Sequence, residues 1–223
     1  MIRNIPGLPG SYAPGDYHGG KIKAYSDAYG SRYDFCRLYE YDGGYALIFN
    51  ANMVISGSAS EELTDFIAMT APHTVESPFC IKLNGYGEEN VTRFTGHFDD
   101  LSANGCKTEL CADDIRQIFT QSFADTDFIS FYSDLSHRVR HGVSKAFLYN
   151  SSFAVCDFTA GGTKYLSCLC TLPGKRRNGD MKRLLSCISR GDEISVTARE
   201  NTADIYRHMG FSEQDTHELY IMT

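Results

Sequence analysis

The sequence has no tryptophan, only six prolines and no long apolar run among its 223 residues. No stretch approaches the roughly 20 apolar residues that a membrane-spanning helix needs. Residues 1–20 lack the basic start and apolar stretch of a signal peptide, so we expect a cytoplasmic protein without a membrane partner. The net charge of −7 lacks the basic excess of nucleic-acid-binding proteins, which argues against that class of partner.

The eight cysteines form neither a disulfide framework nor a Cys-x-x-Cys pair. In a reducing cytoplasm we expect free thiols that pack as small hydrophobic side chains. Cys168 and Cys170 form a Cys-x-Cys on an expected strand, which puts both on one face. Zinc would need two further ligands at suitable spacing, and none is evident in the sequence. No metal site is therefore predicted.

The composition is that of an ordinary globular protein, with enough residues for one large domain or two small ones. The first 35 residues suggest coil with some strand. Further along, the pattern predicts a hairpin over 45–55, a helix that Ser60 opens and Pro72 ends, and a strand over 78–83. Residues 85–105 are polar and rich in turns. We therefore place a domain boundary there, between an α+β domain of unknown role (1–105) and a second domain (106–223).

Hydrophobic periodicity is clearer after the boundary. The expected helices and strands alternate, with Gly191 as the C-cap of the third helix. The helices are expected to start at Ala112 and to cover 129–140, 179–189 and 201–209, and the strands to cover 145–149, 153–158, 164–172, 194–198 and 218–222. This order predicts a mixed α/β (α+β) fold.

Two hairpins share a short sequence likeness. The segment 46–50 (ALIFN) resembles 146–150 (AFLYN), and a hydrophobic strand follows each. One interpretation is that the N-terminal half is a degenerate repeat of the C-terminal half. The other is that two unrelated hairpins resemble each other by chance, and a dozen residues do not decide between them.

A cationic segment carries the strongest functional signal. Between Lys175 and Arg183 there are five cations and one anion in a chain of negative net charge. Lys175, Arg176 and Arg177 come just where a helix is expected to begin. That is the unfavourable end for cations, since a helix N-terminus carries a positive partial charge and free N–H groups. Cations and free donors together favour a bound anion, and phosphate is the usual one.

The residues of this turn resemble a family motif. Pro173-x-x-Arg176-x-x-Gly179 is similar to the acyl-CoA pyrophosphate loop of the GNAT superfamily of N-acetyltransferases, whose pattern is Arg/Gln-x-x-Gly-x-Gly/Ala. The last position of that pattern falls on Met181, so this side chain must point away from the pyrophosphate or the helix must start differently. Downstream, Asn201 and Tyr206-x-x-x-Gly-Phe resemble the family's signature after its fifth strand.

The resemblance covers about 107–223 and implies a GNAT-like mixed central sheet flanked by helices. It also implies acetyl-CoA as co-substrate and a small-molecule or peptide primary amine as acceptor, which attacks the thioester directly. A homodimer is expected from the resemblance alone. The implied cofactor-binding residues are Leu169, Cys170, Thr171, Arg176, Arg177, Asn178, Gly179, Asp180, Met181 and Asn201.

Individual roles follow from the same resemblance. The backbone of 169–171 would pair with the pantetheine arm and polarise the thioester carbonyl, while the N–H groups of 177–181 and the Arg176 side chain would hold the pyrophosphate. Asn201 would bind the pantetheine or the strand end, or else serve as a helix N-cap. Tyr206 is the candidate acid that protonates the departing CoA thiolate.

The general base is not identified by the sequence. The expected fourth strand of the family fold has no carboxylate here, which leaves Asp157, His141 or a water chain. Asp125 and Asp127 could contact a cationic acceptor or could cap a turn. Three functions remain open: an N-acetyltransferase, a non-catalytic acyl-CoA binding or sensing module, and an unrelated anion-binding α/β domain.

Overall fold

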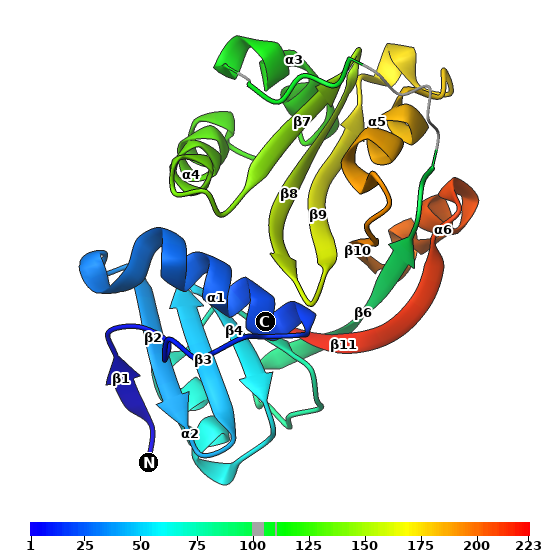
Figure 1. Cartoon of the computed structure of the whole chain (residues 1–223). Helices are drawn as coiled ribbons and strands as arrows, with labels where there is room; N and C mark the ends of the chain where they lie inside the picture. The colour runs from blue at the N-terminus through cyan, green and yellow to red at the C-terminus, as the bar shows by residue number, and fades with distance from the viewer. Residues whose placement is uncertain (100–104, 110) are drawn as a thin grey trace. The chain divides into compact units, whose positions relative to one another are not determined.

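The structure is a computed structural model that describes residues 1–99, 105–109 and 111–223 (Figure 1). Its contacts divide the chain into two compact units. Unit 1 comprises Met1–Phe94, Thr197–Tyr206 and Glu213–Thr223, and unit 2 comprises Thr95–Val196 and Arg207–Ser212. Among the described residues, no helix is both long enough and apolar enough to cross a membrane.

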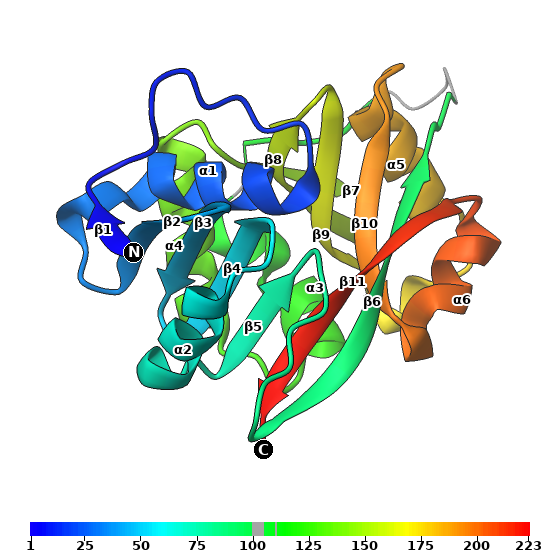
Figure 2. The same ribbon diagram turned by 90° about the horizontal axis from the view of Figure 1, so that it is seen from below.

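Unit 1 is built on a mixed sheet whose strands follow the order β1-β2-β3-β4-β5-β11-β6. The strand β4 pairs with β5 in parallel, whereas β11 pairs with β5 antiparallel. Figure 2 shows α1 and α2 on opposite sides of this sheet. The elements are β1 Arg3–Ile5, α1 Tyr17–Tyr29, η1 Gly30–Arg32, β2 Cys36–Tyr41, β3 Gly44–Phe49, β4 Asn52–Gly57, α2 Glu61–Thr70, β5 Thr74–Ser77, β6 Tyr86–Gly96 and β11 Ser212–Met222.

The helix α1 was not predicted, because its sequence hides the usual signals. Gly19 and Gly20 stand in its first turn, and glycine is a poor helix former. The helix nevertheless starts at a sound N-cap, since the side chain of Asp16 accepts a hydrogen bond from the Gly19 N–H at 2.8 Å. Its buried face, with Ile22 fully inaccessible, packs on β3 and β4. Tertiary packing therefore outweighs local propensity here.

The other predictions for the first half were partly right. The hairpin β3–β4 and the helix α2, with Ser60 as its N-cap, are confirmed. The predicted strand over 78–83 is wrong, because the strand is β5 and ends at Ser77. The polar segment after residue 85 was expected to be turns, yet β6 is a strand of 11 residues. This polar strand lies beside β11 in the sheet. The Arg93 guanidinium on β6 makes two hydrogen bonds with Asp215 on β11 (2.6 and 2.9 Å), and such contacts are not visible in a local sequence pattern.

Unit 2 contains the antiparallel meander β7-β8-β9, with β10 added in parallel beside β9. The helices α3 and α4 cover one face around a core that includes Phe119, Leu135 and Phe153, and α5 covers the other (Figure 1). The elements are α3 Ala112–Ser122, α4 Phe128–Arg140, β7 Lys145–Tyr149, β8 Ser152–Ala160, β9 Thr163–Thr171, η2 Pro173–Lys175, α5 Asp180–Ser189, β10 Ile194–Arg199 and α6 Glu200–Met209, which runs from unit 1 into unit 2.

These elements agree closely with the order predicted for residues 112–222. One terminus differs: the C-cap of α5 is Arg190, whose φ of 46° is left-handed, and not Gly191, which follows it at φ 90°. The final strand is also longer than predicted, because β11 begins at Ser212 in an exposed polar stretch. Exposed strand residues carry no hydrophobic alternation, so a sequence pattern cannot reveal them.

The two halves of the chain share one order of elements. Each has a three-stranded meander, a helix, and a strand parallel to the meander's last strand: β2-β3-β4, α2, β5 in the first half and β7-β8-β9, α5, β10 in the second. A degenerate repeat agrees with this common order of elements, but not with the sequence likeness on which that interpretation was based. In this order β3 corresponds to β8, so the likeness between 46–50 and 146–150 is one strand out of register with the structural repeat.

The compact units do not follow the division at residue 105. The chain's last strand, β11, pairs with β5 of the first half (Leu219 opposite Glu76), and therefore clusters with unit 1. The sequence places this strand in the second domain. The assignment of 1–105 and 106–223 as domains stays a prediction about how the sequence is organised. In the folded chain the residues cluster by their contacts into two units with other bounds.

Candidate functional site

A β-bulge interrupts β9 at the segment predicted to bind the pantetheine arm. Phe153 of β8 lies opposite Cys170, but Val155 lies opposite Ser167, so β9 has one extra residue over this interval. Cys168 takes up that residue with a left-handed φ of 53°. A bulge of this kind bends its strand and increases the local twist.

The bulge coincides with the point where β9 and β10 stop pairing. Their parallel register runs only from Lys164 opposite Ile194 to Leu166 opposite Val196. The stretch of β9 from Ser167 to Thr171 continues beyond that register. Backbone groups on this edge are therefore available to an extended ligand, which can add to the edge as another strand would.

The turn after β9 leads into the N-terminus of α5. Two of its residues have left-handed backbones, Arg177 at φ 68° and Gly179 at φ 79°. Gly179 is the N-cap of α5, and the Arg183 N–H is the first to be bonded, to the Gly179 carbonyl at 3.1 Å. The first turn of an α-helix has no earlier carbonyls to bond its N–H groups. These donors can bind an anion, and the helix dipole favours it.

The charges of this turn are arranged to favour the same ligand. Lys175, Arg176 and Arg177 are exposed, and the Arg176 Nε donates to the Thr171 carbonyl at 3.3 Å. The single acid, Asp180, is buried. Its carboxylate accepts hydrogen bonds from Asn150 Nδ2 (3.1 Å) and Ser151 Oγ (3.0 Å) in the turn of the β7–β8 hairpin. Within this segment Asp180 lies near Arg183, at 4.0 Å from its Nη1, and forms no ion pair with Lys175, Arg176 or Arg177.

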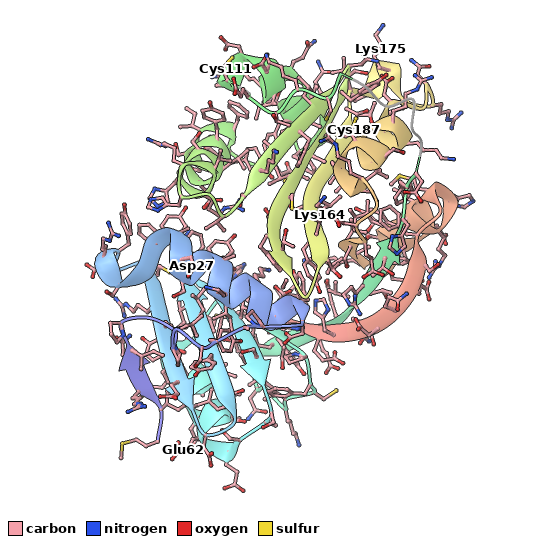
Figure 3. All side chains as sticks on the ribbon, in the orientation of Figure 1. Asp27, Glu62, Cys111, Lys164, Lys175 and Cys187 are labelled. Carbon is pink, nitrogen blue, oxygen red and sulfur yellow. The ribbon has the colours of Figure 1, made fainter. Side chains whose placement is uncertain are left out.

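This turn surrounds a hollow of about 280 Å³ within unit 2. Figure 3 labels Lys175 at the turn between β9 and α5. The hollow is lined by predicted cofactor-binding residues, namely Thr171 and residues 176–181, and by His208 and Met209 from the end of α6. Met181 was expected to point away from the ligand or to shift the helix start. It is half-buried at the second position of α5 and lines the hollow.

The cysteines of β9 belong to the core. Cys170 is buried among the side chains of α3 and α4, and Cys168 packs against the same cluster. Both therefore lie on one side of the strand, as predicted. Burial raises the pKa of each thiol to about 12, so neither is a thiolate nucleophile at neutral pH.

Asn201 and Tyr206 lie on α6 in unit 1. Asn201 is exposed and is the second residue of the helix, so it is not its N-cap. Tyr206 is half-buried and its ring lies 5.7 Å from that of Phe94. Their roles toward a cofactor held in unit 2 stay predictions.

The residues considered for the general base and the acceptor have structural partners. Asp157 pairs with the buried Arg138 at 2.8 Å. Asp127 is the N-cap of α4 and accepts from the N–H groups of Ile129 and Ser130, which lowers its pKa, so it caps the helix as the simpler interpretation had it. His141 is exposed beside His137, with ring centroids 4.4 Å apart.

Sequence reasoning missed two features. The bulge at Cys168 has no sequence signal, since a left-handed cysteine is uncommon. A buried cluster of ionisable side chains in unit 1, around Glu76, was also missed because its members are far apart in the sequence and come from three elements. Only the folded chain brings them together.

No protein-family model and no curated protein matched the sequence. Among solved structures, a protein assigned as an acetyltransferase of the GNAT family from Novosphingobium aromaticivorans is 13% identical, with a TM-score of 0.54 over 93% of this chain and 100% of that one. A GCN5-related N-acetyltransferase from Kribbella flavida is 12% identical, with a TM-score of 0.52 over 84% and 89%.

A third neighbour has no assigned function. It is a conserved protein from Staphylococcus epidermidis, 9% identical, with a TM-score of 0.54 over 82% of this chain and 92% of that one. At such identities a structural likeness establishes the fold alone. The chain has the fold of the GNAT acetyltransferases, as the motifs around Arg176 and Tyr206 predicted.

Proposed function

We propose that this protein is an acyl-CoA-dependent N-acyltransferase that transfers an acetyl group from acetyl-CoA to the primary amine of an acceptor. One observation carries the proposal. A bulged strand, β9, loses its parallel partner after Leu166 and leads directly into a cationic turn at a helix N-terminus. The free strand edge suits the pantetheine arm, and the turn suits the pyrophosphate of the same ligand.

Each part of the cofactor has a place in this arrangement. The N–H groups of 177–181 and the Arg176 guanidinium would bind the pyrophosphate, with Gly179 allowing the left-handed start of the helix. The backbone of Leu169–Thr171 would bind the pantetheine amides, and an N–H of the bulge would polarise the thioester carbonyl as an oxyanion-hole donor does. Attack by the amine then expels the CoA thiolate without a covalent intermediate on the protein.

Proton transfers complete the reaction. Tyr206 would protonate the leaving thiolate, and the phenol, with an ordinary pKa near 10, is only slightly weaker as an acid than a thiol near 8.5. The acceptor ammonium must lose its proton before attack. Asp157 is already bonded to Arg138, so water reaching the amine from solvent is the base that fits best.

Turnover tests the enzymatic part of the proposal. The purified chain would be mixed with acetyl-CoA and a panel of primary amines, and the released CoA thiol would be measured. We expect turnover with at least one amine, and a lower kcat with little change in KM for Tyr206→Phe, since the acid acts on the leaving group. Tyr33→Phe serves as the matched control, because it also removes a tyrosine hydroxyl, from an exposed side chain of unit 1.

A second function is favoured by one observation. The carboxylate nearest in sequence to β9, Asp157, is held by Arg138, and β9 itself contains no acid. A module that binds acyl-CoA without turning it over would need no base. Binding of acetyl-CoA with no thiol release across the whole amine panel would support this module over the enzyme.

A further inference from the structure

Unit 1 contains a buried cluster of ionisable side chains that the acyltransferase proposal does not use. Its members come from three elements: His18 and Lys21 from α1, Glu76 from β5 and His217 from β11. Both imidazoles are only 5% exposed, and the Glu76 side chain is 13% exposed. Burying such groups is costly unless each has a partner, so a cluster of this kind needs an explanation.

Three of these side chains offer ligand atoms that converge. One nitrogen of His18, one of His217 and a Glu76 oxygen all lie within 4.8 Å of one another. The His217 Nε2 is 3.3 Å from Glu76 Oε1. Two ligands of a tetrahedral zinc ion, each about 2.0–2.1 Å from the metal, are about 3.4 Å apart. The His217–Glu76 pair already has that spacing, and His18 needs a shift of about 1.5 Å or less to reach it.

His18 supplies an independent sign of an absent ligand. Its Nε2 is buried and has no hydrogen-bond partner among the residues that the structure describes. The ring meets that of His217 edge-on, with centroids 4.8 Å apart. Imidazole nitrogens are common ligands of transition-metal ions.

We propose that His18, Glu76 and His217 form a binding site for a divalent transition-metal ion of the zinc type. Two imidazoles and one carboxylate are a common donor set for zinc and leave a fourth position for water. Lys21 occupies only the other carboxylate oxygen, because its Nζ lies 2.5 Å from Oε2 and leaves Oε1 for the metal. The site is in unit 1 and does not depend on acyl-CoA binding in unit 2.

Lys21 also opposes the metal. Its ammonium group forms an ion pair with Glu76, so it places a positive charge beside the site. Its Nζ also donates to the Tyr17 hydroxyl at 3.2 Å. The positive charge of Lys21 repels a metal cation bound to the same carboxylate and so lowers the affinity of the site for the metal. Removing the charge of Lys21 should therefore tighten metal binding, which a purely structural ion pair would not predict.

Cobalt(II) is the probe for this site, because a four-coordinate cobalt ion absorbs visible light more strongly than the hydrated ion. The full chain, treated with a chelator and dialysed, would be titrated with CoCl2, and ZnCl2 would then compete. We expect one equivalent of cobalt to produce the band and zinc to remove it. His18→Ala and Glu76→Gln should lose the band, and Lys21→Met should bind cobalt about tenfold more tightly.

The control variant carries His137→Ala with His141→Ala, which removes the neighbouring histidine pair on α4. It should keep the band. Absence of the band from the unaltered chain overturns the proposal, whatever the variants do. So does a band that persists in folded His18→Ala, as judged by circular dichroism, or one that disappears in the α4 variant. If His18→Ala does not fold, Lys21→Met decides: unchanged or weaker affinity overturns the placement of the metal at Glu76.

Discussion

Replacing Arg138 tests how the fold holds α4 against the sheet of unit 2. Arg138 is 5% exposed, and its guanidinium joins α4 to the segment before β7 and to β8. It donates to Asp134 at 2.9 Å, to Ser144 Oγ at 2.7 Å and to Asp157 on β8 at 2.8 Å. Arg138→Met keeps a flexible, unbranched but shorter side chain and removes the charge and every donor. Asp134 and Asp157 then both lose their ion pair with Arg138.

The expected cost follows from burial. Breaking a buried ion pair by removing one partner costs about 3–5 kcal/mol, because the other charge stays uncompensated. Asp134 and Asp157 keep about a quarter of their side-chain surface, so water can reach them. We therefore expect a loss at the lower end, about 3 kcal/mol. For a chain of this size that corresponds to a fall in Tm of about 6–12 °C.

Urea denaturation followed by circular dichroism measures this loss, with Arg140→Met as the matched control. Arg140 is on the same helix but is exposed, and its Nε donates to the Ser136 carbonyl within its own helix. We expect the control to change the free energy of unfolding by less than about 0.5 kcal/mol. A loss for Arg138→Met no larger than about 1 kcal/mol, the value of an exposed pair, would refute the reasoning.

Two further predictions concern single positions. Gly179→Ala should lower the free energy of unfolding by about 1–2 kcal/mol, because Gly179 has a left-handed φ of 79°. Gly174→Ala is the control and should have little effect, since Gly174 has equally open surroundings but no left-handed φ. Thermal denaturation compares the two variants, and equal losses would contradict the assignment. The Cys80 thiol lies 3.4 Å from a Glu218 carboxylate oxygen, and this hydrogen bond raises the pKa of the thiol. Glu218→Gln should therefore speed the alkylation of Cys80 at pH 8. Mass spectrometry measures the rate, and an unchanged rate would contradict the contact.

The sequence predicted unit 2 better than unit 1 for physical reasons. In unit 2 the helices α3 and α4 bury regularly spaced apolar residues such as Ile115, Ile118 and Leu135, and such spacing is visible in a sequence. In unit 1, the first turn of α1 contains two glycines, and β6 includes the polar run 88–90. These elements are stabilised by neighbours that are distant in the sequence, which no local pattern can show.

The candidate site was predicted where chemistry leaves a local signature. Cations at a helix start, with Gly179 at the N-cap, form a short motif, and the structure places those residues around one hollow. Three features could not be predicted from the sequence and were found only in the folded chain. They are the bulge at Cys168, the hydrogen bonds of Asp180 to the β7–β8 turn, and the ion pair of Asp157. Each depends on which residues of distant segments meet, and this depends on tertiary packing.

The central claim is that the turn from Arg176 to Met181 binds the pyrophosphate of an acyl-CoA. Calorimetric titration with acetyl-CoA, CoA and ATP tests it most directly, on the unaltered chain, on Arg176→Ala and on the control Arg140→Ala. We predict that acetyl-CoA and CoA bind, that ATP does not, and that only Arg176→Ala weakens binding, by about tenfold, as loss of one hydrogen bond to a charged group should. No binding of either CoA compound at millimolar concentration would contradict the account.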